Sequence, residues 1–111
     1  MSVGTNWNII CEDFVEDGPE KDNLLRHLKS DNQNSFKLTK ESIRSFSGNC
    51  FETKSSKEKN VLIISDAGWQ GMPAEPKKFL ENNLIICASR ISVIERVGGG
   101  SARCMVAGLY F

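Results

Sequence analysis

The sequence carries no excess charge of either sign, because 14 basic residues balance 14 acidic ones in a chain of 111 residues. Nucleic acids and anionic membranes attract proteins with a basic excess, so this balance argues against both as partners. The chain also has no apolar run of membrane-spanning length, and its first residues lack the basic and apolar regions of a secretory signal. These absences predict a cytoplasmic protein that binds neither nucleic acid nor membrane.

The pattern of a metal site is missing as well. The cysteines lie far apart, without the paired spacing of zinc ligands or the density of a disulfide-stabilised secreted domain. They are Cys11, Cys50, Cys87 and Cys104. The single histidine, His27, lies beside an apolar stripe on an expected helix over residues 19–30, where such a residue is ordinarily structural. We therefore expect reduced thiols, no metal and no organic cofactor.

The length suits one domain that spans residues 1–111. Short apolar runs within it alternate with helical patterns and predict strands at residues 8–11, 35–38, 50–53, 61–64, 84–87 and 91–94. Helices are expected at residues 19–30, 40–47 and 66–69, and from residues 73–76 onward. We expect the runs at 61–64 and 84–87 to be buried strands. This order predicts an α/β or α+β fold with mixed sheets covered by helices.

Two stretches of the sequence resemble each other. Residues 8–11 read Asn-Ile-Ile-Cys, and residues 83–87 read Asn-Leu-Ile-Ile-Cys. Each run belongs to a unit of strands and a helix, so the repetition indicates two related modules.

Three consecutive glycines, Gly98, Gly99 and Gly100, stand shortly before Cys104. Glycine adopts backbone conformations closed to other residues and lets a ligand come close, so the run predicts an open loop beside a thiol. We expect Cys104 to lie on a short final strand, where Arg103 would face away from it because neighbours alternate across a strand. From these residues alone, Cys104 is either a nucleophile or a small buried hydrophobe.

The sequence resembles the superfamily of guanidino-group-modifying enzymes, and most particularly its arginine-deiminase-related amidinotransferase branch. The residues that carry the resemblance are Gly98-Gly99-Gly100-Ser101-Ala102-Arg103-Cys104-Met105, with support from Ile94-Glu95 and Phe46-Ser47-Gly48-Asn49. The resemblance implies the pentein fold, a β/α propeller of five ββαβ-type modules. It also implies that this chain is the C-terminal part of such an enzyme, about two modules of an incomplete ring.

The resemblance assigns roles to several residues. Cys104 matches the family nucleophile, whose thiolate attacks the guanidinium carbon of a small arginine-like substrate and forms a covalent thiouronium intermediate. Gly98, Gly99, Gly100 and Ser101 match the loop at the substrate site, and Asn49 is a candidate pocket residue. Whether water or an amine then accepts the amidino group, making the enzyme a hydrolase or a transferase, stays open.

The resemblance also implies that the catalytic set is incomplete. Branch members carry their catalytic histidine directly before the strand that here begins at Ser2, and their substrate carboxylates further upstream, whereas His27 does not match that position. The chain would then be inactive alone and would self-associate through its exposed module edges. The alternative is a non-catalytic small α/β binding domain, or a truncated one, in which Cys104 has no role.

Overall fold

Two units of the same strand–strand–helix–strand topology follow one another along the chain. They appear in a computed structural model that describes residues 1–31 and 34–109. In each unit the first two strands are antiparallel and the third runs parallel to the middle one. The first module contains β1 (Ser2–Val3), β2 (Trp7–Ile10), the 3₁₀ helix η1 (Glu12–Phe14), α1 (Pro19–Asp31) and β3 (Asn34–Lys37).

The second module has one more helix. A short helix, α2 (Lys40–Arg44), connects it to the first module. Its elements are β4 (Phe51–Lys54), β5 (Asn60–Ser65), α3 (Asp66–Gln70), α4 (Ala74–Asn83) and β6 (Ile85–Ser89). The strand orders are β1-β2-β3 and β4-β5-β6, so the described residues form two separate mixed sheets. The expected α+β arrangement with mixed sheets is therefore observed.

Helix starts follow the expected capping chemistry. Thr39 Oγ1 accepts a hydrogen bond from the Ser42 backbone N–H at 3.1 Å and begins α2. Ser65 Oγ does the same for the Gly68 N–H at 3.0 Å and begins α3. Such caps satisfy backbone donors that the first helical turn leaves unpaired. However, α2 ends at Arg44, short of the expected end at residue 47.

The last part of the chain is helical where strands were expected, so that prediction is wrong. Residues 91–94 contribute to α5 (Ser92–Gly98), and Cys104 lies on a 3₁₀ helix, η2 (Ala102–Met105), while residues 106–109 contain no strand. The apolar side chains of Val93, Ile94 and Val97 repeat at helical spacing, which the shorter β-branched run concealed. Gly99 ends α5 in the left-handed conformation, with φ of 70°.

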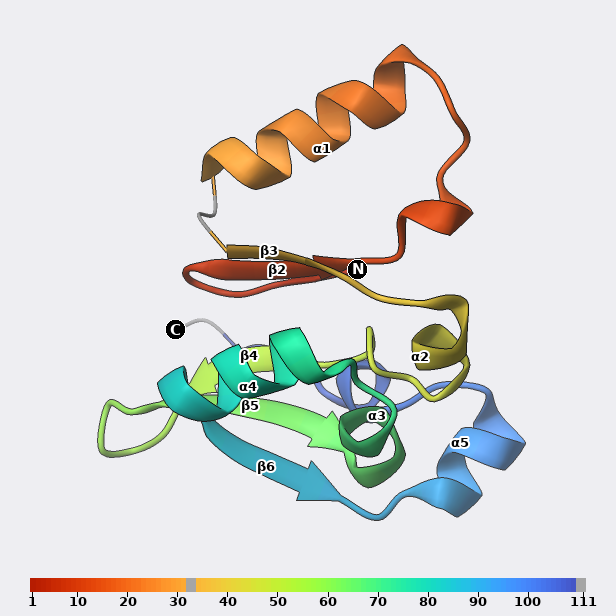
Figure 1. Cartoon of the computed structure of the whole chain (residues 1–111). Coiled ribbons are helices and arrows are strands. Elements are labelled where there is room, and N and C mark those ends of the chain that lie inside the picture. The colour runs from red at the N-terminus through yellow and green to blue at the C-terminus, as the bar shows by residue number, and fades with distance from the viewer. Residues whose placement is uncertain (32–33, 110–111) are drawn as a thin grey trace.

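The two modules stack as alternating layers (Figure 1). From one end to the other they are α1, the first sheet, α4 and the second sheet. The phenyl rings of Phe36 on β3 and Phe79 on α4 lie 5.2 Å apart across the layer boundary. A shared hydrophobic cluster joins the modules, and its fully buried members include Trp7, Ile9, Leu62, Ile64 and Leu80.

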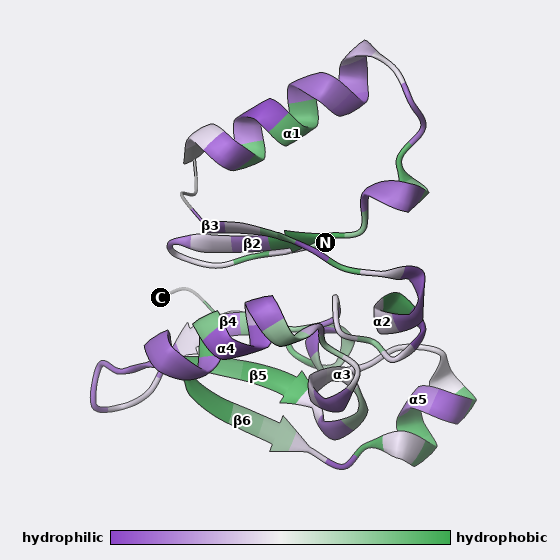
Figure 2. Ribbon diagram, viewed as in Figure 1, coloured by the Kyte–Doolittle hydropathy of each residue, from purple (hydrophilic) through white to green (hydrophobic). Residues whose placement is uncertain are grey.

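The second strand expected to be buried, at residues 84–87, is largely exposed. Leu84 is buried, but it lies before β6, and the Ile85 and Cys87 side chains on β6 are exposed. The reason is topological: β6 is an edge strand and, among the described residues, no α-helix covers the face of the sheet on which Ile85 pairs with Val61. Figure 2 shows β5 and β6 as the apolar strands of this sheet.

The similar runs at residues 8–11 and 83–87 are not equivalent strands. Residues 8–10 lie on β2, the middle strand of the first module, whereas residues 85–87 lie on β6, the third strand of the second. The strand that corresponds to β2 is β5. The prediction of two related modules therefore agrees with the topology, although the two similar runs occupy different positions in their modules.

Candidate active site

Cys104 is exposed, unlike the buried cysteines Cys11 and Cys50. It lies on η2, where its backbone N–H donates to the Ser101 carbonyl oxygen at 3.0 Å. Its Sγ accepts a hydrogen bond from Asn49 Nδ2, with the two atoms 3.0 Å apart. The thiol is therefore reachable from solvent and held by a polar partner, which is not the setting of a small buried hydrophobe.

The structure brings Asn49 and Cys104 together from positions far apart in the sequence. Besides donating to Sγ, the Asn49 carboxamide accepts a hydrogen bond at Oδ1 from the Arg103 backbone N–H, at 2.9 Å. Asn49 precedes β4, so one side chain ties the start of that strand to the turn that carries the thiol.

The glycine run shapes the approach to the thiol unevenly. A β-carbon added at Gly100 would lie 3.2 Å from Cys104 Cβ and 3.4 Å from Sγ, whereas one added at Gly98 would meet nothing within 4 Å. Ser101, which is fully buried, donates a hydrogen bond through Oγ to the buried Glu95 carboxylate of α5. Gly100 is thus the member of the run that keeps space beside the sulfur.

Hydrogen bonding sets the ionisation of the Cys104 thiol. The Asn49 side-chain N–H lowers the pKa of Cys104 most, followed by the Ser101 backbone; a smaller opposing effect of burial comes next, and the positive charge of Arg103 lowers the pKa least. At Cys50, the residue after Asn49, the pKa shifts in the opposite direction, since burial raises the pKa of that thiol to about 11. The structure therefore favours the reactive thiolate at one cysteine and suppresses it at the other.

Arg103 connects the turn to the N-terminal strand. Its Nη1 donates to Ser2 Oγ at 3.5 Å, and Ser2 Oγ lies 2.8 Å from the carbonyl oxygens of both Gly48 and Cys50. Arg103 therefore forms a structural hydrogen bond, although the strand on which it was expected to face away from Cys104 is a 3₁₀ helix. Nothing in the sequence indicated that Ser2 would be buried in this network.

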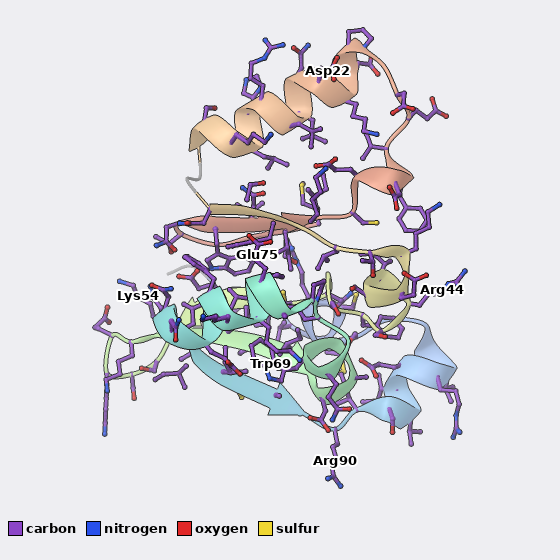
Figure 3. The ribbon with its side chains drawn as sticks, viewed as in Figure 1. Asp22, Arg44, Lys54, Trp69, Glu75 and Arg90 are labelled. Carbon is purple, nitrogen blue, oxygen red and sulfur yellow. The ribbon has the colours of Figure 1, made fainter. Side chains whose placement is uncertain are left out.

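His27 lies away from the thiol. It is on α1, which sits on the far side of the first sheet from the second module, and its Nδ1 is 2.8 Å from the Asn23 carbonyl oxygen (Figure 1). The exposed Arg90 follows β6 and points out of the molecule (Figure 3). Among residues 1–31 and 34–109, no group of three His, Cys, Asp or Glu side chains is placed to hold a metal ion.

An open cavity of about 620 Å³ lies next to η2, the turn that carries Cys104. Its wall combines side chains of β4 and β5, including Phe51 and Ile63, with Arg103 and residues 106–109, among them Val106. No pattern in the sequence indicated this wall, because the end of the chain was expected to be a short strand that includes Cys104. Across the part of the chain that the structure describes, no helix combines the length and apolar character needed to span a bilayer.

Comparison with known proteins gives one match. No curated protein and no solved structure matches the chain. The family described as "N,N dimethylarginine dimethylhydrolase, eukaryotic" matches over residues 1–111. That family falls within the guanidino-modifying superfamily that the sequence resembles, whereas the amidinotransferase branch stays a prediction. Since the match covers the whole chain, the protein belongs to the eukaryotic N,N-dimethylarginine dimethylhydrolase family.

Proposed function

We propose that this chain supplies the cysteine nucleophile, Cys104, of an enzyme that hydrolyses the guanidino group of a small arginine-like substrate. The observation that carries the proposal is the state of the thiol: it is exposed, and the Asn49 N–H lies 3.0 Å from Sγ and lowers the pKa of Cys104. A thiolate is the attacking species in covalent catalysis by cysteine. The family match supplies the substrate class, dimethylated arginine or a close relative.

The proposed reaction has two steps. In the first, the Cys104 thiolate attacks the guanidinium carbon, the bond from that carbon to one nitrogen breaks, and the nitrogen leaves as an amine that takes up a proton. The carbon is then bound to Sγ as a thiouronium. In the second, water attacks the same carbon, gives up its protons, and releases a ureido product and the thiolate. An acceptor amine in place of water would make the reaction an amidino transfer.

The proposal places the remaining catalytic groups outside these 111 residues. Proton transfer to the leaving amine needs a general acid, and holding a guanidinium needs carboxylates. His27 lies on the outer helix and is not placed for the first task. Support for an upstream source comes from Ser2, which contacts Gly48 and Cys50, the neighbours of Asn49, and Arg103, the neighbour of Cys104, so the N-terminal strand lies beside the site. We therefore expect the chain alone to have little or no activity.

The layered packing supports the proposal that the two modules belong to a larger propeller. In the stack, α4 of the second module covers one face of the first sheet, whereas the matching face of the second sheet is covered, among residues 1–31 and 34–109, only by the short 3₁₀ helix η2 and residues 106–109. A further module would cover it in the same way. In repeat arrays, each unit buries its apolar face against its neighbour, and an end without a cap stays exposed.

The surface area gives independent support for an association. The chain exposes 7405 Å², whereas a self-contained monomer of 12.4 kDa is expected to expose about 6,100 Å². The surplus of about 1,300 Å² exceeds the roughly 800 Å² that each partner buries in a standard interface. We propose that this surplus surface contacts another polypeptide and that, when expressed alone, the chain self-associates through it.

The test of the catalytic proposal compares two alkylating reagents. Chloroacetamidine carries a planar cation that mimics the guanidinium group, and chloroacetamide is its neutral counterpart. In a longer protein that includes the groups that hold the guanidinium, we expect Cys104 to react faster with the cation than with the neutral reagent, and we expect the exposed Cys87 to show no such preference. Peptide mass spectrometry after brief labelling measures both sites in one sample.

The two cysteines provide the control within one molecule. A Cys104→Ser variant should lose the selective labelling without change at Cys87. Equal preference at Cys104 and Cys87, in this chain and in a longer one that includes the upstream segment, would remove the support for a guanidino site and favour a non-catalytic binding domain.

A further inference from the structure

We propose that Asn49 is the positioning residue of Cys104: its carboxamide fixes the place of Sγ and donates to it a hydrogen bond that a thiolate accepts better than a thiol. This inference rests on the proposed function, because it concerns the same nucleophile. It assigns to Asn49 a role in preparing the sulfur rather than in lining a substrate pocket.

The first step is the orientation of the carboxamide. An asparagine side chain has one acceptor end and one donor end. Oδ1 accepts a hydrogen bond from the Arg103 backbone N–H at 2.9 Å. That N–H is a donor only and cannot accept a hydrogen bond. Rotating the amide by half a turn would set its NH₂ group against that N–H and lose this bond. The Arg103 N–H therefore fixes Nδ2 as the end that meets Cys104 Sγ.

The second step is the consequence for the sulfur. A neutral thiol is a weak acceptor, whereas hydrogen bonds to an ionised acceptor are roughly twice as strong as those between neutral groups. A donor held 3.0 Å from Sγ thus stabilises the thiolate more than the thiol. The direction agrees with the pKa of Cys104, which is lowered and for which the Asn49 hydrogen bond is the largest cause.

The third step is the rigidity of Asn49 itself. Its backbone N–H donates to the Phe46 carbonyl oxygen at 2.9 Å, and the carbonyl groups on both sides of it, those of Gly48 and Cys50, lie 2.8 Å from the buried Ser2 hydroxyl. Phe46 has φ of 65°, a conformation that tightens the turn before Asn49. A donor attached to an immobilised backbone need not be ordered again when the thiol ionises, which is the requirement of a preorganised site.

The experiment measures how the alkylation rate of Cys104 depends on pH, with the neutral reagent iodoacetamide. Asn49→Asp keeps the size of the side chain and the acceptor for the Arg103 N–H, but it sets a carboxylate oxygen against the sulfur. We expect the midpoint of the Cys104 profile to move upward by about one pH unit or more, so that the rate at pH 7 falls about tenfold. Asn49→Ala removes the donor to Sγ together with the acceptor of the Arg103 N–H but adds no charge, and it should move the midpoint upward by less.

Asn23→Asp is the matched control, because it adds the same charge at an exposed position of α1 on the far side of the first sheet. Its Cys104 profile should coincide with that of the unchanged protein, and labelling of the buried Cys11 and Cys50, measured in every sample, reports unfolding. A midpoint in Asn49→Asp equal to that in Asn23→Asp would overturn the inference.

A second measurement needs no Asn49 variant. In the unchanged protein, the side-chain NH₂ resonance of Asn49 should shift with pH along the same curve as the Cys104 ¹³Cβ resonance, and Cys104→Ser should abolish that shift. Independent curves would overturn the inference. Neither readout uses a guanidino compound, so this inference can fail while the preference for chloroacetamidine stands, and the reverse.

Discussion

The two modules share one topology but differ in what covers the outer faces of their sheets. In the first module, β2 is buried along its whole length, and Ile10 is only 4 % exposed beneath α1. In the second, Ile85 is 49 % exposed, and the parts of the chain against that face are η2 and the segment at residues 106–109. The same fold unit is thus closed in one copy and open in the other.

The open face is where the candidate nucleophile lies. The turn η2 rests on β5, so Cys104 is carried by the thin layer over the second sheet rather than by a helix packed on the core. A nucleophile must be reachable by substrate, and thinly covered segments are drawn from the least stable part of a structure. The first module supplies the rigid part through Ser2, which anchors the backbone beside Asn49.

The largest expected effect comes from making the same substitution on the closed and on the open face. Ile10→Ala removes a buried side chain and should lower the free energy of unfolding by about 2–4 kcal/mol. Ile85→Ala removes a half-exposed one and should lower it by less than about 1 kcal/mol. Urea unfolding followed by circular dichroism measures both.

This comparison has a second readout, the state of association. If another copy covers the open face, dilution should weaken the coverage, and the effect of Ile85→Ala should grow with protein concentration. Sedimentation velocity over the same concentration range checks this directly. If the protein is a monomer at all concentrations and the two substitutions lower the free energy of unfolding equally, the second sheet is as well covered as the first.

The next effect is the dependence of folded stability on pH through two cysteines, Cys50 and Cys104. Burial raises the pKa of Cys50 from an ordinary 9.0 to about 11, so between these pH values the unfolded chain loses the Cys50 proton first and folded stability falls. The total loss is on the order of 2–3 kcal/mol. Cys104 acts in the opposite sense, because its pKa is lowered and its ionisation favours the folded state as the pH rises toward 9.0.

Unfolding experiments between pH 8 and pH 11 test the effect of Cys50. Cys50→Ala should flatten the decline in stability relative to the unchanged protein, and Cys104→Ala should leave that decline in place. Equal slopes in the unchanged protein and in Cys50→Ala would mean that the Cys50 thiol is not shielded from water.

The sequence predicted the closed regions of the molecule better than the open ones. The 3.6-residue stripe of α1, the starts of α2 and α3 and the buried run on β5 are local signals that packing reinforces, and each appears where expected. The errors lie at the second sheet's open side: β6 is exposed, and the segment from residue 92 to residue 105 is helical. Apolar β-branched residues there resembled strands because no local signal says whether a face will be covered.

The candidate site shows the same division. The glycine run marked Cys104 from sequence alone, since glycines beside a thiol are a local pattern, and the resemblance singled out Asn49. The contact between Asn49 and Cys104 spans 55 positions and depends on how β4 meets η2, which only the folded chain determines. The buried hydroxyl of Ser2 joined the site for the same reason, with no pattern in the sequence to announce it.

The smallest expected effect comes from a substitution within the glycine run. It tests whether the space beside Cys104 Sγ is limited. Gly100→Ala would set a methyl group 3.4 Å from Cys104 Sγ, and we expect iodoacetamide to alkylate Cys104 several-fold more slowly, about 1 kcal/mol in activation free energy. Gly98→Ala is the matched control, because it adds the same group where nothing lies within 4 Å, at the last residue of α5. There the rate should be unchanged, while unfolding becomes more costly by up to about 1 kcal/mol, since alanine favours a helix over glycine. Equal alkylation rates in the two variants would mean that η2 moves aside freely, so that the sulfur would not be held in the fixed position that the contact with Asn49 requires.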